Sequence, residues 1–292
     1  MNRIAEVHIS ASNLRHNIAE FKGLVRTGTA IAAVVKANAY GHGLQQVVEA
    51  IDGHVDYFQV DDVYELRELR QFTDTPALLL GYVTEAEAPE AIRLNAEFGI
   101  FRLGQARMLV RIAEMLGRQI KIHVAIDALF GREGLLTAQI GPLLLELADL
   151  PSIDLEGIYS HFSDVENTAG VDHSERQVAE YYLAVSQLKR DGNQKIMTHI
   201  SATSGILAYE ISYNENPLVR LGIGLYGLWP SPEFGHKFEG EGIFLKPVLR
   251  WLSTVASIKS VPEGYPIGYG MTFLTTRPTS LALITIGASS KV

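Results

Sequence analysis

The chain has 292 residues, of which 47% are hydrophobic, and this length allows one large barrel or two domains. Its formal net charge of -8 and isoelectric point near 5.6 argue against a nucleic-acid binder, which would carry a basic surface. The absence of cysteine excludes disulfides and thiolate metal sites. The polar start from Met1 to Glu6 does not fit a signal peptide, and no run of about 18 apolar residues occurs, so we expect a soluble cytoplasmic protein without a membrane partner.

Apolar, strand-like runs alternate with amphipathic helical patterns along most of the chain, with helices expected at 63–72 and 86–94. Eight strands over about 230 residues, each followed by a helix or loop, are typical of a (β/α)8 barrel of the TIM type. An open doubly wound sheet is the alternative. The eight strands are expected at Ile31–Val35, Tyr57–Val60, Ala77–Tyr82, Glu97–Arg102, Lys121–Asp127, Leu155–His161, Ile196–Ser201 and Val219–Gly224.

The pattern changes after the eighth expected strand. The segment 229–242 is rich in proline and glycine and is predicted to be a linker. Leu249–Ile258 and Ser280–Ile286 then alternate like strands, with turn residues between them. We therefore expect a cofactor-binding barrel over residues 1–232 and a β-rich, apparently incomplete second domain over 233–292.

The segment from Ala33 to Gly43 places a lysine, Lys36, at the end of an apolar strand. Ligands bind at the carboxyl ends of parallel strands, so Lys36 is expected to face a site. A lysine in a partly desolvated pocket has a lowered pKa and can form a Schiff base with a carbonyl such as that of pyridoxal phosphate. The ordinary alternative is a lysine whose stem lies on the surface of the strand end.

This segment resembles the alanine racemase family, whose pyridoxal-phosphate lysine lies in a V-V-K-A-N-A-Y-G-H-G sequence. The resemblance implies a pyridoxal 5'-phosphate-dependent racemase that interconverts L- and D-alanine and supplies cell-wall (peptidoglycan) precursors. It also implies a head-to-tail homodimer. Further motifs that carry the resemblance, in order, are Asp127–Arg132, Tyr159–Phe162, His199–Ser204, Leu218–Gly227 and Gly268–Phe273.

The phosphate of that cofactor is the first group that the resemblance assigns to residues. It implies that Tyr40 donates its hydroxyl and that Gly222 and Ile223 offer backbone amides. The glycines at the end of the eighth expected strand would let those amides approach an anion closely. The family has one hydroxyl residue where this chain has Thr203 and Ser204, so either of the two can be the phosphate contact.

Arg220 bears on the type of reaction. An arginine stays protonated, so opposite the pyridine nitrogen it can only donate, and a weak electron sink favours returning a proton to Cα over transamination. Its neighbours Leu218 and Val219 indicate a strand end that faces inward. The resemblance places His199 in contact with this arginine and His161 beside the second catalytic base, although single histidines are more often core or cap residues.

Racemisation requires two acid/base groups on opposite faces of a planar carbanion. The resemblance assigns these roles to Lys36 and Tyr269, the tyrosine coming from the partner subunit of a twofold dimer. A free tyrosine, with a pKa of about 10, is a poor base, so Tyr269 would need a cationic neighbourhood.

The substrate side departs from the family pattern. Arg132 matches an arginine that holds the substrate carboxylate, but Ala125 stands where relatives have a bracing lysine, and 128–130 also differ. Arg132 is then held by a bound anion or by Glu133, or it is held loosely, which should weaken substrate positioning. A racemase for another amino acid and a truncated cofactor-binding protein with little activity are therefore alternatives, since relatives continue beyond position 292 with further site-forming segments. Barrel-type decarboxylases need a cysteine, which this chain lacks.

Overall fold

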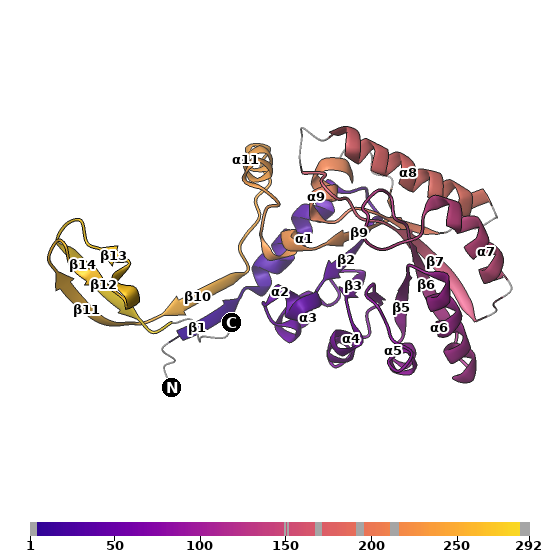
Figure 1. The fold of residues 1–292 in the computed structure, drawn as a ribbon, viewed down its shortest axis with the longest axis horizontal. Helices are drawn as coiled ribbons and strands as arrows, with labels where there is room; N and C mark the ends of the chain where they lie inside the picture. Colours follow the sequence, from indigo (N-terminus) through magenta and orange to yellow (C-terminus); the bar gives the residue numbers. More distant parts are fainter. Residues whose placement is uncertain are drawn as a thin grey trace. The chain divides into compact units, whose positions relative to one another are not determined.

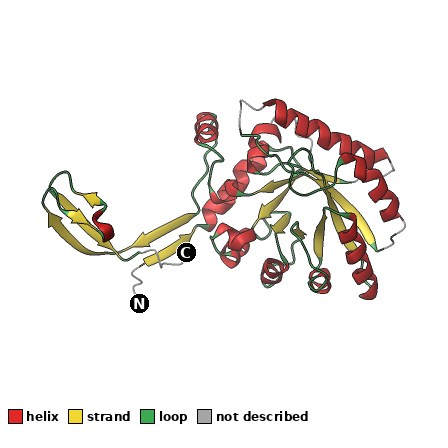
Figure 2. Cartoon of the chain, in the orientation of Figure 1, coloured by secondary structure: helices red, strands yellow, loops and turns green. Residues whose placement is uncertain are grey.

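The computed structural model describes residues 5–148, 150, 152–166, 171–190, 196–210 and 216–286. The chain divides into two compact units, which can be followed in Figures 1 and 2. One unit contains residues 10–248 and is called the barrel unit below. The other contains residues 1–9 and 249–292 and is called the terminal unit.

Eight parallel strands form the barrel unit, in the spatial order β8-β7-β6-β5-β4-β3-β2-β9. Strands adjacent in sequence are adjacent in space, which is the order of a TIM-type barrel and confirms the expected fold class. The amide of Arg220 in β9 donates at 3.0 Å to the carbonyl of Ser201, two residues after the end of β8, which links the two end strands. The strands are β2 Ala30–Val34, β3 Tyr57–Val60, β4 Ala77–Leu79, β5 Ala96–Ile100, β6 Ile120–Ala125, β7 Ile153–Tyr159, β8 Met197–His199 and β9 Leu218–Leu221.

Helices lie on the outside of these strands (Figure 1). Local side chains explain where some of them begin: the Ser10 hydroxyl accepts from the Asn13 amide at the start of α1, and Asp62 accepts from the Glu65 amide at the start of α4. The helices are α1 Ala11–Leu24, α2 Lys36–Tyr40, α3 Leu44–Ile51, α4 Val63–Leu69, α5 Ala88–Arg93, α6 Leu103–Met115, α7 Ile140–Ala148, α8 Val171–Arg190, α9 Thr203–Gly205 and α11 Pro232–Gly240. Shorter helical turns are η1 Thr137–Gln139, η3 Ile206–Glu210, η4 Ile223–Tyr226 and η5 Tyr269–Met271.

The core lies along the barrel strands. Strands β4, β5 and β9 are buried at every position, and β2 at all but its first, because a parallel strand is covered on both faces. This explains why the strands appear in the sequence as continuous apolar runs. The polar and charged side chains that are also buried include Glu97, His123, His199 and Arg220.

The terminal unit consists of small antiparallel sheets, as the sequence led us to expect. β1 Ala5–Ile9 pairs with β10 Leu249–Ser253, and β11 Val255–Val261 pairs with β14 Thr279–Ile284. A third pair joins the two-residue strands β12 Pro266–Ile267 and β13 Phe273–Leu274. The expected strand 249–258 is thus two strands, since β10 and β11 pair with different partners. The strand β1 was not expected.

The predicted linker at 229–242 is wrong for its central part, which folds as helix α11. Ser231 caps this helix by accepting from the amide of Phe234 at 3.4 Å, and Pro232 occupies the first turn, where it needs no amide partner. The ring of Trp229 stacks on that of Phe238, with ring centroids 6.0 Å apart. Helix α11 belongs to the barrel unit, so the units divide at 248/249 and not at the expected 232/233.

Among the described residues, no helix has the length and apolar character that a membrane span requires.

Candidate active site

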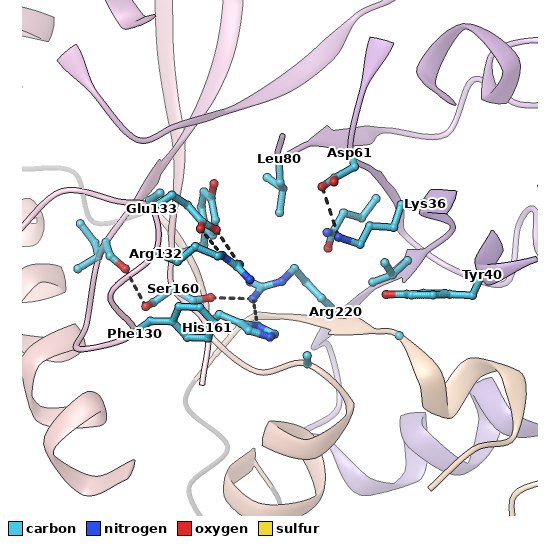
Figure 3. A pocket seen from close by; sticks show the side chains of 17 residues that line it. Lys36, Tyr40, Asp61, Leu80, Phe130, Arg132, Glu133, Ser160, His161 and Arg220 are labelled. Carbon is cyan, nitrogen blue, oxygen red and sulfur yellow. Dashed lines mark hydrogen bonds and ion pairs between the residues drawn. The ribbon is translucent and has the colours of Figure 1, made fainter. Parts of the chain in front are cut away.

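A cavity of about 180 Å³ opens at the carboxyl ends of the barrel strands (Figure 3). Lys36 follows β2, Asp61 follows β3, His161 follows β7, and Arg220 lies within β9, so several strands deliver side chains to one place. The lining consists of Val34, Lys36, Tyr40, Gln59, Asp61, Leu80, Ala125, Ile126, Phe130, Arg132, Glu133, Tyr159, Ser160, His161, Ala202, Arg220 and Gly222.

Lys36 points into this cavity with its side chain 34% exposed, and its Nζ lies 3.5 Å from Oδ1 of Asp61 (Figure 3). The lysine is therefore partly removed from water and paired with a carboxylate. Asp61 was not among the residues expected from the sequence. Its position directly after the apolar strand β3 was the available signal, because polar residues at strand ends of a barrel face the site.

The turn after Lys36 has an unusual backbone. The helix α2 is left-handed from Ala37 to Tyr40, with φ between 52° and 54°, a conformation that costs L-residues roughly 1–2 kcal/mol each. Glu65 stabilises it, since one carboxylate oxygen accepts from the Ala37 amide and the other from the Asp61 amide at 2.8 Å. Asn38 also accepts from the Leu44 amide at 2.8 Å. Four such residues in a row persist only where the surroundings hold them, as at functional sites.

Two hydroxyl groups converge near Gly222. A Cβ atom at this glycine would lie 3.8 Å from Oγ1 of Thr203 and 3.8 Å from the hydroxyl oxygen of Tyr40. The Thr203 oxygen accepts from the Gly224 amide at 3.1 Å, so its own hydrogen is available to an anion. Without a Cβ, Gly222 leaves space for that anion beside both hydroxyls.

The other residues expected near the phosphate are placed differently. Ser204, the alternative to Thr203, donates its hydroxyl to the carboxylate of Glu166. Ile223 opens the turn η4 behind Gly222 and is not part of the cavity lining. The geometry therefore favours Thr203 over Ser204 as the hydroxyl that meets an anion at Gly222.

Arg220 is buried beneath the cavity with 4% of its surface exposed. Its Nη1 donates to Nδ1 of His199 at 2.7 Å and to the carbonyl of the same residue at 2.8 Å, and its Nη2 donates to the Ser160 carbonyl at 2.7 Å. Nη2 also lies 3.3 Å from Nδ1 of His161 (Figure 3). Burial lowers the pKa of Arg220 to about 10, so the guanidinium is charged at neutral pH.

Both histidines act as acceptors toward Arg220. Burial, followed by the charge of Arg220, lowers the pKa of His161 to about 3 and takes the pKa of His199 well below its ordinary value. His161 lines the cavity, whereas His199 is completely buried behind Arg220 and does not line it. His199 therefore reaches a cofactor only through the arginine.

Arg132 lines the cavity, and Glu133 holds it. Two atoms of the guanidinium, Nε and Nη2, donate to the two carboxylate oxygens, the second bond being 2.7 Å long, and the guanidinium also covers the ring of Phe130 at 4.4 Å. This ion pair takes the pKa of the Glu133 carboxyl below its ordinary value. Ala125 lies in the lining with 2% exposure and has no side chain that could hold Arg132. Glu133, the residue next to Arg132 in the chain, holds the arginine instead.

Two buried polar atoms in the cavity wall have no hydrogen-bond partner among the described residues: the hydroxyl of Tyr159 and Oε1 of Gln59. Neither atom is open to the cavity, and the Tyr159 hydroxyl lies close to Gly99, where a Cβ would come within 2.7 Å of it. The hydroxyls at Gly222 and the donor at Arg220 are the groups that fit a ligand with a phosphate at one end and a polar ring at the other.

Comparison with known proteins identifies the family. The family model for the N-terminal domain of alanine racemase matches residues 9–230, and that for the C-terminal domain matches residues 248–289. The chain belongs to the alanine racemase family. It is 35% identical to alanine racemase 2 of Caldanaerobacter subterraneus over 98% of this chain and 72% of that protein, and 33% identical to the alanine racemase of Methanococcus maripaludis, covering 97% and 74%.

Solved structures agree with this assignment. The alanine racemase of Clostridium difficile 630 superimposes with a TM-score of 0.86 at 29% identity, over 98% of this chain and 74% of that one. An alanine racemase of Bacillus anthracis with bound L-Ala-P gives a TM-score of 0.82 at 25% identity, over 98% and 73%.

Tyr269, the residue that the resemblance assigns as a second base, lies in the terminal unit. It begins the turn η5, and its side chain is fully exposed. The residues that line the cavity, Lys36 among them, belong to the barrel unit. Within the described residues, no group of three potential ligands is arranged to hold a metal ion.

Proposed function

We propose that the chain is a pyridoxal 5'-phosphate-dependent alanine racemase that works in the cytoplasm as a homodimer. The observation that carries the proposal is that Lys36, the hydroxyls around Gly222 and the guanidinium of Arg220 belong to one cavity region. A lysine, an anion site and a permanent donor are the three groups that this cofactor needs. Family membership supports the same reading.

The chain's own groups account for cofactor binding. Tyr40, Thr203 and the open side of Gly222 would hold the phosphate, and Arg220 would face the ring nitrogen. When bound, pyridoxal phosphate supplies a carbonyl for the amine of the substrate and an electron sink that acidifies the Cα–H bond. Because Arg220 is charged and donates, it would keep the ring nitrogen unprotonated, which would favour return of a proton over transamination.

Proton transfer requires one group on each side of the substrate. We assign one side to Nζ of Lys36, which lies 3.5 Å from a carboxylate oxygen of Asp61. We assign the other side to Tyr269 of the partner subunit. Two bases explain inversion, since a single base returns the proton to the face from which it came.

The substrate carboxylate would meet Arg132. Glu133 fixes the guanidinium from behind through two bonds, which orients the arginine but also takes up donors that a carboxylate could use. Because these donors are occupied, racemisation of an amino acid other than alanine is the second candidate function.

The decisive experiment is racemisation of L-alanine by the purified chain with added pyridoxal phosphate, while the visible absorbance of the Schiff base is recorded. We expect both turnover and absorbance. Absorbance without turnover of alanine, but with turnover of another amino acid, would establish the second candidate. Absence of both would refute a racemase.

A further inference from the structure

Four side chains from four barrel strands form a buried line of hydrogen bonds that starts at Arg220. Nη1 of Arg220 in β9 is 2.7 Å from Nδ1 of His199 in β8. Nε2 of His199 is 3.0 Å from Nδ1 of His123 in β6, and Nε2 of His123 is 3.0 Å from a carboxylate oxygen of Glu97 in β5. The two histidines are fully buried, and Glu97 and Arg220 are each 4% exposed.

The chemistry of the two ends fixes the direction of every bond. Arginine can only donate, so Nδ1 of His199 accepts, and the proton of this imidazole lies on Nε2. Nε2 of His199 therefore donates to Nδ1 of His123, whose own proton lies on Nε2 and is donated to Glu97. The opposite direction would leave His199 with no proton on either nitrogen. All donation thus runs from Arg220 to Glu97.

The barrel makes room for this line at Gly157 in β7, the strand between β6 and β8. A Cβ at this position would lie 2.1 Å from Nδ1 and 2.7 Å from Cε1 of His123. Any side chain larger than hydrogen would displace the His123 ring, so the absence of a side chain at Gly157 is a condition for the contact with His199.

The line ends at the carboxylate of Glu97, whose negative charge can compensate the buried positive charge of Arg220. In the part of the chain that the structure describes, no carboxylate lies within ion-pair distance of Arg220, although a buried cation normally requires compensation. Glu97 is the carboxylate connected to it, through two imidazoles. Its second oxygen lies 3.6 Å from Nζ of Lys121, which also binds Glu156 at 2.7 Å.

We propose that Glu97 and His123 are positioning residues for Arg220. The Glu97 carboxylate, acting through the two imidazoles, strengthens the hydrogen bond from Arg220 to His199 and so weakens the hydrogen bonds that the guanidinium can donate toward the cavity. Hydrogen bonds in a buried series polarise one another, so an anionic acceptor at one end strengthens each acceptor in turn. The guanidinium is then held firmly on its His199 side and presents a weaker positive field to a ring nitrogen. This inference rests on the proposed function only for its catalytic consequence, and not for the line itself.

The line is tested without cofactor by ¹⁵N NMR of the chain labelled at histidine, with the His123 signal assigned from the variant His123→Asn. We expect both His123 and His199 to carry one proton, on Nε2, at neutral pH. Glu97→Gln should shift the ring nitrogens of both residues, whereas Glu156→Gln, which alters a carboxylate on the same Lys121, should leave them unchanged. A proton on Nδ1 of His123, or a doubly protonated ring in the original chain, would overturn the proposal.

The catalytic consequence is measured on the holoenzyme as the ratio of transamination to racemisation. Glu97→Gln should raise this ratio about two- to fivefold, because the loss of charge reaches Arg220 weakened by two imidazoles. Glu156→Gln should keep the original ratio, and an equal ratio in both variants would refute the effect on Arg220. Failure of the proposed function can be told apart from failure of this inference. If the proposed function were wrong, the original chain would show no turnover, and the NMR experiment would still decide whether the line of hydrogen bonds exists.

Discussion

The two units of the chain bury their strands to very different degrees. β5 in the barrel unit is buried at all five positions, whereas β11 in the terminal unit is exposed everywhere except at Val261. Apolar side chains such as Ile258 and Leu283 in the terminal unit are 72% and 63% exposed. The barrel unit therefore contains its own core and the whole cavity, while the terminal unit has little core of its own and carries Tyr269 fully exposed.

The difference in burial suggests different roles for the two units. We propose that stability, cofactor binding and the first base belong to the barrel unit, and that the terminal unit contributes the second base to a partner. Substitutions in the first unit should then affect binding or folding, and substitutions in the second should affect turnover alone.

The largest effect is expected for Lys36→Ala. Loss of the Schiff-base amine and of one base should lower racemisation by about 10⁴-fold and remove the visible absorbance of bound cofactor. Lys22→Ala, which alters an exposed lysine of α1, is the matched control. Persistence of the absorbance band in Lys36→Ala would exclude Lys36 from the site.

Tyr269→Phe tests the other unit. Removing one hydroxyl from the terminal unit should lower conversion of L-alanine by about 10²–10³-fold while cofactor absorbance stays the same. Tyr265→Phe is the control, because this hydroxyl accepts from Lys259 at 3.2 Å within the same unit. If Tyr269→Phe racemises L-alanine at the original rate, the two-base scheme is wrong.

Substitutions in the two units should also differ in their effect on the free energy of unfolding. Phe58→Ala, at a fully buried position of β3, should lower the free energy of unfolding by about 3–5 kcal/mol. Ile258→Ala, at a position of β11 that is 72% exposed, should change it by less than about 0.5 kcal/mol. Denaturant unfolding at a protein concentration where the chain is monomeric measures both. Similar losses in the two variants would show that the terminal unit is covered in the single chain.

The fold could be predicted further than the site. All eight barrel strands were predicted because each is an apolar run bounded by turn residues, a local signal. β1 was missed because its alternating pattern is short and its partner β10 lies more than 200 positions away. Residues within motifs, such as Lys36 and Arg220, were predicted from the sequence, and both line the cavity. Asp61, Glu97 and His123 were not, because their importance comes from contacts between strands, which spacing does not reveal.

Acid should destabilise the barrel unit through its buried histidines. The pKa of His161 in the folded chain, about 3, lies below the value of about 6.5 in an unfolded chain, so the unfolded state binds a proton first as the pH falls. The contribution of His161 is complete above pH 6.5 and is lost toward pH 3, with a slope of at most about 1.4 kcal/mol per pH unit. His161→Gln should flatten the measured dependence of unfolding free energy on pH, and His54→Gln, at an exposed position, should not. An unchanged slope in His161→Gln would mean that His161 is already accessible to protons.

Glu65 is expected to act on the cavity only through the backbone. Its carboxylate accepts from the amides of both Ala37 and Asp61, and a glutamine has one oxygen and so can satisfy only one of them. Glu65→Gln should therefore loosen the left-handed turn, lower turnover by about five- to tenfold and weaken the cofactor absorbance, with little change in unfolding free energy. Glu68→Gln, one turn further along α4 and exposed, is the control. If the two variants behave alike, the left-handed turn does not depend on Glu65, and the strained backbone after Lys36 is a property of the turn sequence itself, including Asn38.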